Sequence, residues 1–284
     1  MKKELTPFVE ILLAATIWGS AGVFIRYISM PPEILGFFRL AIPTIILFFY
    51  FQFQKIKIFT KKIGTVFIIS ILNAVRTILY LIAFGLTSIG NAVILLYTWP
   101  IFASIFGVII LKEKLDKKKL SLILLAFLGV VIAFSNREFS FNDTNFVGMS
   151  MMIASGLLYA LTVIIFKKEE NHFSNIEMVF YQNALASLIF IPFVISYPSF
   201  EIEKIELAVV YSVVIGLIPF LLFFSALKKI AASSATSLTY IEIVSAIIFG
   251  FIFFQEIISL NVLIGGGLII GSALLMKNNI KKLN

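Results

Sequence analysis

The side chains that could do chemistry in this chain are a few charged residues set inside long apolar runs. Arg39, Arg76 and Glu242 are each surrounded mainly by Ile, Leu, Val, Phe and Ala. Placing an ionisable group at membrane depth is costly, which makes each of the three a functional candidate. Two guanidinium groups at a similar depth could bind a carboxylate or phosphate of a small solute. The alternative is structural: both arginines could reach outward to lipid headgroups or bond to backbone carbonyls.

Glu242 is the sharpest of these candidates, because it falls near the centre of its apolar run with Thr239 and Ser245 at helical spacing. A carboxyl group held away from water is readily protonated, so Glu242 could couple transport to protons. It could instead bind a substrate ammonium group, or pair with Arg76 or Arg39. The remaining alternative is a permanently neutral or paired structural residue.

A polar stripe accompanies Arg76. Four polar residues recur at i, i+3, i+4 and i+7, which is one face of a helix: Asn73, Arg76, Thr77 and Tyr80. In an apolar segment this face must contact protein or water, so it lines a solute site or an interhelical hydrogen-bond network. The predicted substrate-binding residues, aromatic groups included, are Arg39, Asn73, Arg76, Tyr80, Tyr97, Trp99, Tyr240 and Glu242. Weaker candidates are Trp18, Tyr159 and Gln182.

Residue usage argues against several other kinds of chemistry. The chain has no Cys and one His, His172, which excludes disulfides, thiolate metal sites and most His-based catalysis. No cluster of nucleophile, base or metal ligands is evident, so we expect no enzyme activity, no bound metal and no cofactor. No GxxxxGK[ST] motif is present, which argues against transport driven by ATP hydrolysis.

The elements that position these residues are predicted to be membrane-spanning helices. The 284 residues are 60% apolar and only 13% charged, and the mean hydropathy is +1.05. A helix of roughly 20 apolar residues crosses a bilayer of about 30 Å. Ten runs approach or exceed that length: 7–28, 33–53, 63–84, 88–111, 118–135, 145–166, 175–196, 206–227, 231–254 and 259–276.

The basic residues predict orientation and location. The net charge is +8, but the Lys residues lie in short loops between apolar runs, so we expect a lipid bilayer and not nucleic acid as the partner. With ten spans, 18 Lys residues fall on one side, against Arg26, Arg137 and Lys204 on the other. The positive-inside rule then predicts a multi-pass protein of the cytoplasmic membrane with both termini in the cytoplasm.

An internal repeat divides the chain into halves. A shift of 143 residues places 83–113 on 226–256 with ten identities in 31 positions, where composition alone gives roughly three. The same shift pairs Tyr97 with Tyr240 and Trp99 with Glu242. Five spans per half reverse the second half, which predicts an all-α fold of two inverted five-helix repeats, 1–136 and 144–280, in one integrated unit. Prolines within the runs are hinge candidates: Pro43, Pro100, Pro192 and Pro219.

Short motifs across the whole chain are typical of one transporter family. They are Ala15-Thr16-Ile17-Trp18-Gly19, Phe38-Arg39, Tyr97-Thr98-Trp99-Pro100, Gly107 with Lys112-Glu113-Lys114, and Gly250 with Gln255-Glu256. With these residues the chain resembles the drug/metabolite transporter superfamily, in particular its EamA-type members. The resemblance implies movement of small metabolites, often amino acids, and in some members of drugs.

Together these features predict a secondary transporter working by alternating access. Its expected partner is a small polar metabolite, with an amino acid or related carboxylate favoured, and coupling to protons is one open option. A multidrug exporter is the second alternative, and a lipid flippase or scramblase is an alternative of a different class. The chain is predicted to be a monomer or a weak homodimer, since Gly267-xxx-Gly271 could pack inside the fold or between copies.

Overall fold

Apolar runs in hydrocarbon must satisfy their backbone hydrogen bonds internally, and here they do so as α-helices. The computed structural model describes residues 6–56, 58, 62–86, 95–113, 116–133, 135, 143–199, 201–255 and 260–280. Over these residues the chain is helical and contains no strand. The helices are α1 (Pro7–Gly19), α2 (Ala21–Ile28), α3 (Pro32–Phe53), α4 (Ile63–Leu86), α6 (Trp99–Leu111), α7 (Lys117–Ala133), α8 (Asp143–Lys168), α9 (Asn175–Ile189), α10 (Ile191–Ile195), α11 (Ile202–Val214), α12 (Ile218–Lys229), α13 (Ala232–Leu238), α14 (Ile241–Phe254) and α15 (Leu260–Ile280).

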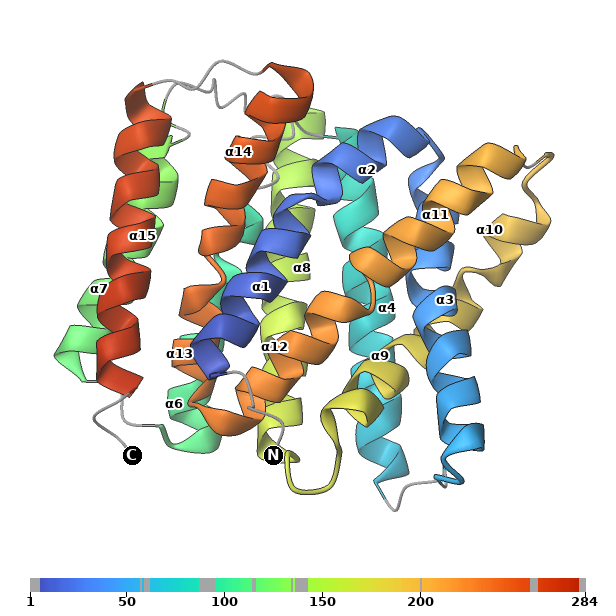
Figure 1. Ribbon diagram of the computed structural model, residues 1–284, viewed down its shortest axis with the longest axis horizontal. Coiled ribbons are helices and arrows are strands. Elements are labelled where there is room, and N and C mark those ends of the chain that lie inside the picture. The colour runs from blue at the N-terminus through green and yellow to red at the C-terminus, as the bar shows by residue number, and fades with distance from the viewer. Residues whose placement is uncertain are drawn as a thin grey trace.

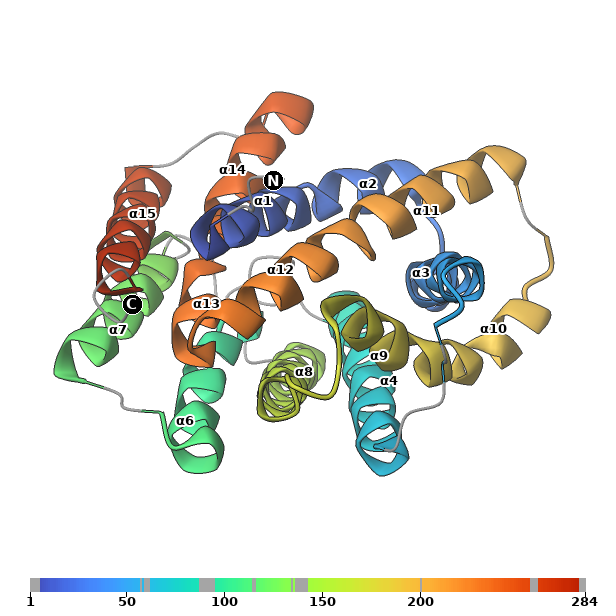
Figure 2. The ribbon, with the colours of Figure 1, turned by 60° about the horizontal axis from the view of Figure 1, so that its bottom comes forward.

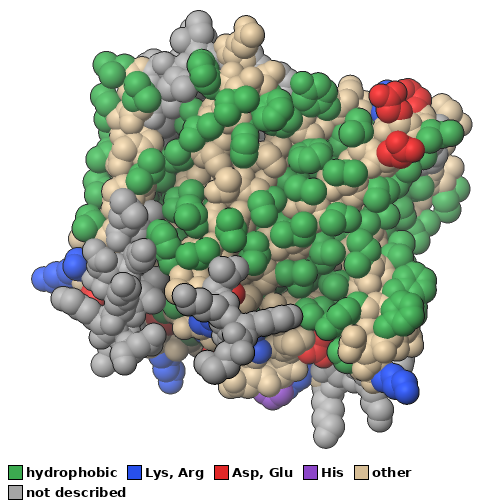
Figure 3. Space-filling view, in the orientation of Figure 1, with side chains coloured by type: hydrophobic (Ala, Val, Ile, Leu, Met, Phe, Trp, Pro, Cys, Tyr) green, Lys and Arg blue, Asp and Glu red, His purple; other side chains and the backbone are tan. Residues whose placement is uncertain are grey.

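Six segments of the described chain are long and apolar enough to cross a bilayer: Pro7–Ile25, Pro32–Phe53, Ile63–Ala83, Phe146–Lys168, Ile202–Lys229 and Ser234–Phe253. Figure 3 shows hydrophobic side chains over most of one face, with charged groups near its lower edge and upper corner. The all-helical membrane prediction is confirmed. Ten crossings stay a prediction, because the other described helices do not meet the limits of length and hydropathy together, and residues 87–94 of the run 88–111 lie outside the described residues.

Four of the predicted runs differ from expectation in being interrupted. Runs 7–28 and 175–196 break at Ser20 and Phe190, and runs 206–227 and 231–254 break between α11 and α12 and between α13 and α14. Three of the hinge prolines stand in the first turn of a helix that follows a break: Pro100, Pro192 and Pro219. Proline is favoured there because its missing N–H has no partner to lose. Pro43 alone of the four lies inside a described helix.

The helices pack side by side. The first described helix begins, and the last one ends, at the same end of the bundle. Figure 1 shows α1 beginning and α15 ending at the lower end of the molecule. Figure 2 shows α7 and α15 on one flank and α3 and α10 on the other, with α1, α12 and α8 between them. Close contacts join α4 to α8, α7 to α15 and α1 to α12. Helices α1, α6 and α12 carry the aromatic core, which includes Trp18, Trp99, Phe223 and Phe224.

The residues paired by the 143-residue shift occupy matching places in α6 and α14. Each helix follows a break and ends in a left-handed residue, Lys112 with φ of 56° and Gln255 with φ of 53°. At the breaks themselves the Tyr240 hydroxyl donates to the Tyr97 carbonyl oxygen at 3.0 Å. The two tyrosine rings stack with centroids 6.0 Å apart. The two broken helices therefore meet at residues that the repeat makes equivalent.

Candidate functional site

A cavity of about 60 Å³ lies among α1, α3, α4, α6, α8, α12 and α14. It contains the charged residues that the sequence places at membrane depth. Its lining is Trp18, Ala21, Arg39, Arg76, Tyr80, Leu96, Trp99, Tyr159, Ile215, Phe220 and Glu242. Sites for drug-sized ligands usually occupy about 300–1,000 Å³. In this conformation the cavity therefore fits a small solute or one polar group of a larger one.

Arg76 is held by neutral partners on α4 and α8. Its side chain is buried, and its Nε donates to Oδ1 of Asn73 at 3.0 Å. Its guanidinium carbon lies 4.4 Å from the ring centroid of Tyr159, a cation–π contact that stabilises by about 0.5–2 kcal/mol. Among the described residues no carboxylate lies within ion-pair distance of Arg76. Its position is thus fixed while its charge is not neutralised.

Arg39 and Glu242 form a second charged group across the cavity. Arg39, on α3, lies with its guanidinium carbon 5.9 Å from the Tyr80 ring centroid. Glu242 stands in the first turn of α14, where the helix dipole favours a carboxylate. The Tyr97 side chain hydrogen-bonds to Glu242, and Arg39 acts on it electrostatically. Glu242 and Arg39 therefore interact electrostatically.

Aromatic rings form a continuous wall beside these charges. Trp18 meets Phe220 edge to face with centroids 5.0 Å apart, and Trp99 packs on Tyr159 at 4.7 Å. Phe223 bridges the two indoles, at 5.7 Å from Trp18 and 6.1 Å from Trp99. Such pairs add about 0.5–1.5 kcal/mol each beyond the area they bury. The wall offers an apolar surface next to the cationic groups.

Among the described residues, two buried polar atoms in the lining have no hydrogen-bond partner. They are the indole Nε1 of Trp18 and the hydroxyl of Tyr159. The two residues are only 7% and 6% exposed. Leaving a buried donor unsatisfied costs about 1–3 kcal/mol. Both residues line the same cavity as Arg76. They are thus available to a ligand.

Below Arg76, α4 and α9 are joined by a seam of hydrogen bonds, formed by Ser70, Asn73, Tyr181, Gln182 and Asn183. Asn73 Nδ2 donates to the Gln182 carbonyl oxygen at 2.7 Å and to Asn183 Oδ1 at 3.1 Å. The Ser70 hydroxyl donates to the Tyr181 carbonyl oxygen. Both amide atoms of the Gln182 side chain are buried without a partner. The α4–α9 seam therefore continues the polar lining away from the cavity.

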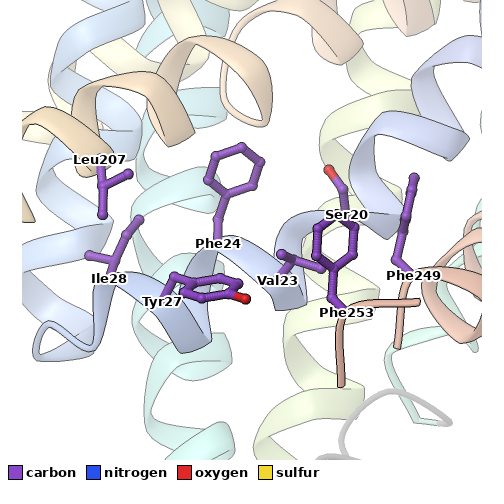
Figure 4. Close-up of a pocket in the computed structure, with 8 residues that line it drawn as sticks. All are labelled: Ser20, Val23, Phe24, Tyr27, Ile28, Leu207, Phe249 and Phe253. Carbon is purple, nitrogen blue, oxygen red and sulfur yellow. The ribbon is translucent and has the colours of Figure 1, made fainter. Parts of the chain in front are cut away.

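A larger hollow of about 390 Å³ lies on another part of the surface, between α2, α11 and α14. Figure 4 shows Phe24, Leu207 and Phe253 among the side chains that line it. Among the described residues that line it, the polar side chains are Ser20 and Tyr27, and none is charged. The groups able to recognise a polar solute therefore belong to the smaller cavity.

Comparison with known proteins identifies the family. The model of the EamA-like transporter family matches residues 8–135 and 146–277, which together make up most of the chain. The chain belongs to the EamA-like transporter family. It is therefore a multi-pass membrane transporter, as its apolar helices indicate. This membership makes an enzyme activity improbable, and the described residues contain no group of three or more His, Asp and Glu arranged to hold a metal.

The relatives of this EamA-like transporter are distant but span its length. A protein of Archaeoglobus fulgidus named as an uncharacterized transporter is 25% identical, over 93% of this chain and 94% of its own. The uncharacterized transporter YoaV of Bacillus subtilis is 22% identical, over 95% and 94%. The pseudopaline exporter CntI of Pseudomonas aeruginosa is 22% identical, over 85% and 84%. A crystal structure matches with a TM-score of 0.81 at 15% identity, covering 98% of both chains, which shows the fold alone.

The structure of this EamA-like transporter brings together five of the eight predicted binding residues: Arg39, Arg76, Tyr80, Trp99 and Glu242. The other three lie outside that lining. Asn73 accepts a bond from Arg76, and Tyr97 hydrogen-bonds to Glu242. Tyr240 donates to the Tyr97 carbonyl oxygen. The lining also contains Trp18 and Tyr159, which the sequence indicates as weaker candidates, and four residues that the sequence does not indicate: Ala21, Leu96, Ile215 and Phe220. Those four carry no polar side chain, so only their positions in space could reveal them.

Proposed function

We propose that this chain is a secondary transporter that moves a small polar metabolite, with an amino acid or related carboxylate favoured, across the cytoplasmic membrane by alternating access. The observation that carries the proposal is the cavity, where Arg39, Arg76 and Glu242 meet beside an aromatic wall. Charged side chains at membrane depth usually bind a substrate or an ion, or relay protons. Glu242 is the candidate for proton coupling.

The proposal includes ten spans arranged as two inverted halves, residues 1–136 and 144–280. In support, α6 and α14 begin within one residue of the positions that the 143-residue shift makes equivalent, and they end at equivalent residues. The contact between Tyr240 and Tyr97 joins them at the breaks. Broken helices meeting near the membrane midplane are typical binding sites in transporters with inverted repeats.

A second pair of equivalent contacts supports the same arrangement and provides two gates. The shift makes Asn73 equivalent to Gly216, and Gln182 equivalent to Arg39. At one crossing the Asn73 side chain donates to the Gln182 carbonyl oxygen. At the other, a Cβ added to Gly216 would stand only 2.7 Å from the Arg39 carbonyl oxygen. We propose these crossings as the inner and outer gates, the first held by hydrogen bonds and the second by close backbone packing.

The end of the bundle where α1 begins is proposed to face the cytoplasm. The last turns of α8 and α12, which carry two Lys residues each, lie at this end, and the positive-inside rule places such residues in the cytoplasm. There, Lys229 Nζ pairs with Glu10 Oε1 at 2.8 Å, and Lys167 Nζ donates to the Leu227 carbonyl oxygen at 2.8 Å. These contacts join α12 to α1 and α8, so they support a closed cytoplasmic side. The distant likeness to a protein named as an exporter makes export the direction to test first.

Two alternatives have less support. A multidrug exporter for lipophilic cations fits poorly with a small cavity carrying two guanidinium groups. A lipid flippase or scramblase is favoured by one observation, the apolar hollow beside α2, since Ser20 lines that hollow and the adjacent Ala21 lines the cavity. That proximity would let an acyl chain and a headgroup occupy neighbouring spaces.

Uptake into proteoliposomes separates these functions. The purified chain is reconstituted and tested with a panel of radiolabelled amino and organic acids, with and without a pH gradient, and in parallel with fluorescent lipids. We expect saturable movement of at least one carboxylate that Arg76→Gln abolishes. Lipid movement without solute movement would replace the carrier proposal with a flippase.

A further inference from the structure

Hydrogen-bond donors around the cavity greatly outnumber acceptors. Arg39 and Arg76 are donors only, and so is the indole of Trp18. Tyr159 adds a hydroxyl that has no partner. Against these donors, Glu242 is the one carboxyl group among the described lining residues, and Tyr97 already hydrogen-bonds to it. The group that completes this cavity must therefore supply several acceptor atoms, as an oxyanion does.

The charges of the lining do not balance. Two guanidinium cations face one carboxyl group, so one positive charge remains when Glu242 is ionised and two remain when it is protonated. Glu242 interacts with Arg39, whereas the charged neighbour acting on Arg76 is Arg39 itself, another cation. An uncompensated charge in a buried site is strongly unfavourable. In both states of Glu242, the ligand that restores neutrality carries net negative charge.

We propose that Arg76, Trp18 Nε1 and the Tyr159 hydroxyl together bind an oxyanion of the substrate, and that the substrate is a small net-negative carboxylate and not a zwitterion. This inference rests on the proposed function and narrows its substrate class. The Tyr159 hydroxyl belongs to the ring that lies under the Arg76 guanidinium, which brings both donors to one region of the cavity. Trp18 lines the same space.

Charge distinguishes this substrate class from simple amino acids. An anion bound at Arg76 leaves the lining neutral with Glu242 ionised, whereas a zwitterion leaves the excess positive charge in place. The ammonium group of a zwitterion would also add a third cation beside Arg39 and Arg76. The remainder of the ligand contacts the wall formed by Trp18, Trp99 and Phe220. A short apolar body bearing a carboxylate satisfies both surfaces.

Intrinsic fluorescence offers a direct binding assay, because the chain has two Trp residues and both line the cavity. The full chain in lipid nanodiscs is titrated at pH 7 with two series, each of which presents an anion, a zwitterion and a cation on a similar apolar body. One series is butyrate, 2-aminobutyrate and propylamine; the other is 3-phenylpropionate, phenylalanine and phenethylamine. We expect the anion of at least one series to bind at least about tenfold more tightly than its zwitterion, with no detectable binding of the amines.

Conservative variants test the individual donors. Tyr159→Phe and Trp18→Phe keep an aromatic ring and remove one donor, so each is expected to weaken binding of the anion about tenfold, the loss of one charge-assisted hydrogen bond. In Trp18→Phe, Trp99 remains as the reporter. Tyr50→Phe is the matched control, because Tyr50 is 39% exposed on the outer surface of α3 and should bind as wild type does. Thermal unfolding of each variant checks that it is folded.

The outcomes separate this inference from the proposed function. Equal affinity for anion and zwitterion, absence of binding by every anion, or wild-type affinity in both folded donor variants would overturn the inference. Proteoliposomes containing the wild-type chain are tested with the same six compounds. Binding of anions in the expected order without their transport would leave the inference standing and contradict the carrier function. Transport of a zwitterion or amine in preference to the anions would support a carrier and overturn the inference.

Discussion

Replacing Asn73 by alanine tests whether the α4–α9 seam holds the inner gate closed. The variant removes the two bonds from Asn73 Nδ2 across the crossing, of 2.7 Å to the Gln182 carbonyl oxygen and 3.1 Å to Asn183 Oδ1. It also removes the bond that Asn73 Oδ1 accepts from Arg76 Nε, but that bond lies within α4 and does not join the two helices. A neutral hydrogen bond contributes about 0.5–1.5 kcal/mol net, so the closed state should lose about 2 kcal/mol. That loss corresponds to roughly a thirtyfold shift toward an open seam.

The assay uses a single engineered thiol, since the chain contains no Cys. Val66→Cys places it on α4 below Asn73, on the same helix face, at a residue that is 4% exposed. The rate of reaction with a small methanethiosulfonate reagent in nanodiscs reports opening of the seam. We expect Asn73→Ala to raise this rate about thirtyfold. Asn183→Ala removes only the 3.1 Å bond and should raise it by about fivefold or less.

A second reporter distinguishes gating from general loosening. Met152→Cys lies on α8 at a fully buried position that packs with Ala83. Its labelling rate should be the same with and without Asn73→Ala. An unchanged Val66→Cys rate in Asn73→Ala would refute the role of the seam, and so would equal acceleration at both reporters.

Three further substitutions probe the cavity and the helix crossings. Glu242→Gln keeps a hydrogen-bonding partner for Tyr97 but cannot ionise. In proteoliposomes, a pH gradient should no longer stimulate uptake by this variant, while solute exchange at equal pH persists. Stimulation by the gradient at the wild-type level would remove Glu242 from proton coupling. Tyr240→Phe removes the bond to the Tyr97 carbonyl oxygen and should lower stability by about 1–2 kcal/mol in chemical unfolding, an effect that is absent if the two broken helices do not depend on this contact. Gly216→Ala puts a methyl group 2.5 Å from the Ser212 carbonyl oxygen and 2.7 Å from that of Arg39. We therefore expect the free energy of unfolding to fall by about 1–3 kcal/mol, measured as a lower Tm. An unchanged Tm would show that the crossing can relax.

Much of the fold could be predicted from the sequence because a bilayer allows few solutions. A long apolar run must satisfy its backbone internally, so hydropathy alone predicts helices. The breaks were harder to predict, because proline marks only some of them. Phe190 precedes Pro192, whereas α2, the helix that follows Ser20, contains no proline. There the break falls at a Gly/Ser pair, Gly19-Ser20, where a Cβ on Gly19 would collide with Ser245 Oγ of α14.

The charged part of the site could be predicted for a similar reason. Arg39, Arg76 and Glu242 stand out because a charge in an apolar run needs a special environment. Trp18 and Tyr159 do not stand out, because aromatic residues are common throughout the chain, which has 31 Phe residues. Their significance comes from two unpaired polar atoms facing one cavity, which is a property of packing alone.

The central proposal, one cavity reached in turn from both sides of the membrane, has a direct test in Ala21→Cys. Ala21 lines the cavity, and the new thiol would be the only one in the chain. In proteoliposomes of uniform orientation, a membrane-impermeant thiol reagent is applied to one side or the other. We predict labelling from both sides, slowed in each case by a bound carboxylate. Labelling from one side only, with no protection by any solute, would contradict alternating access at this cavity.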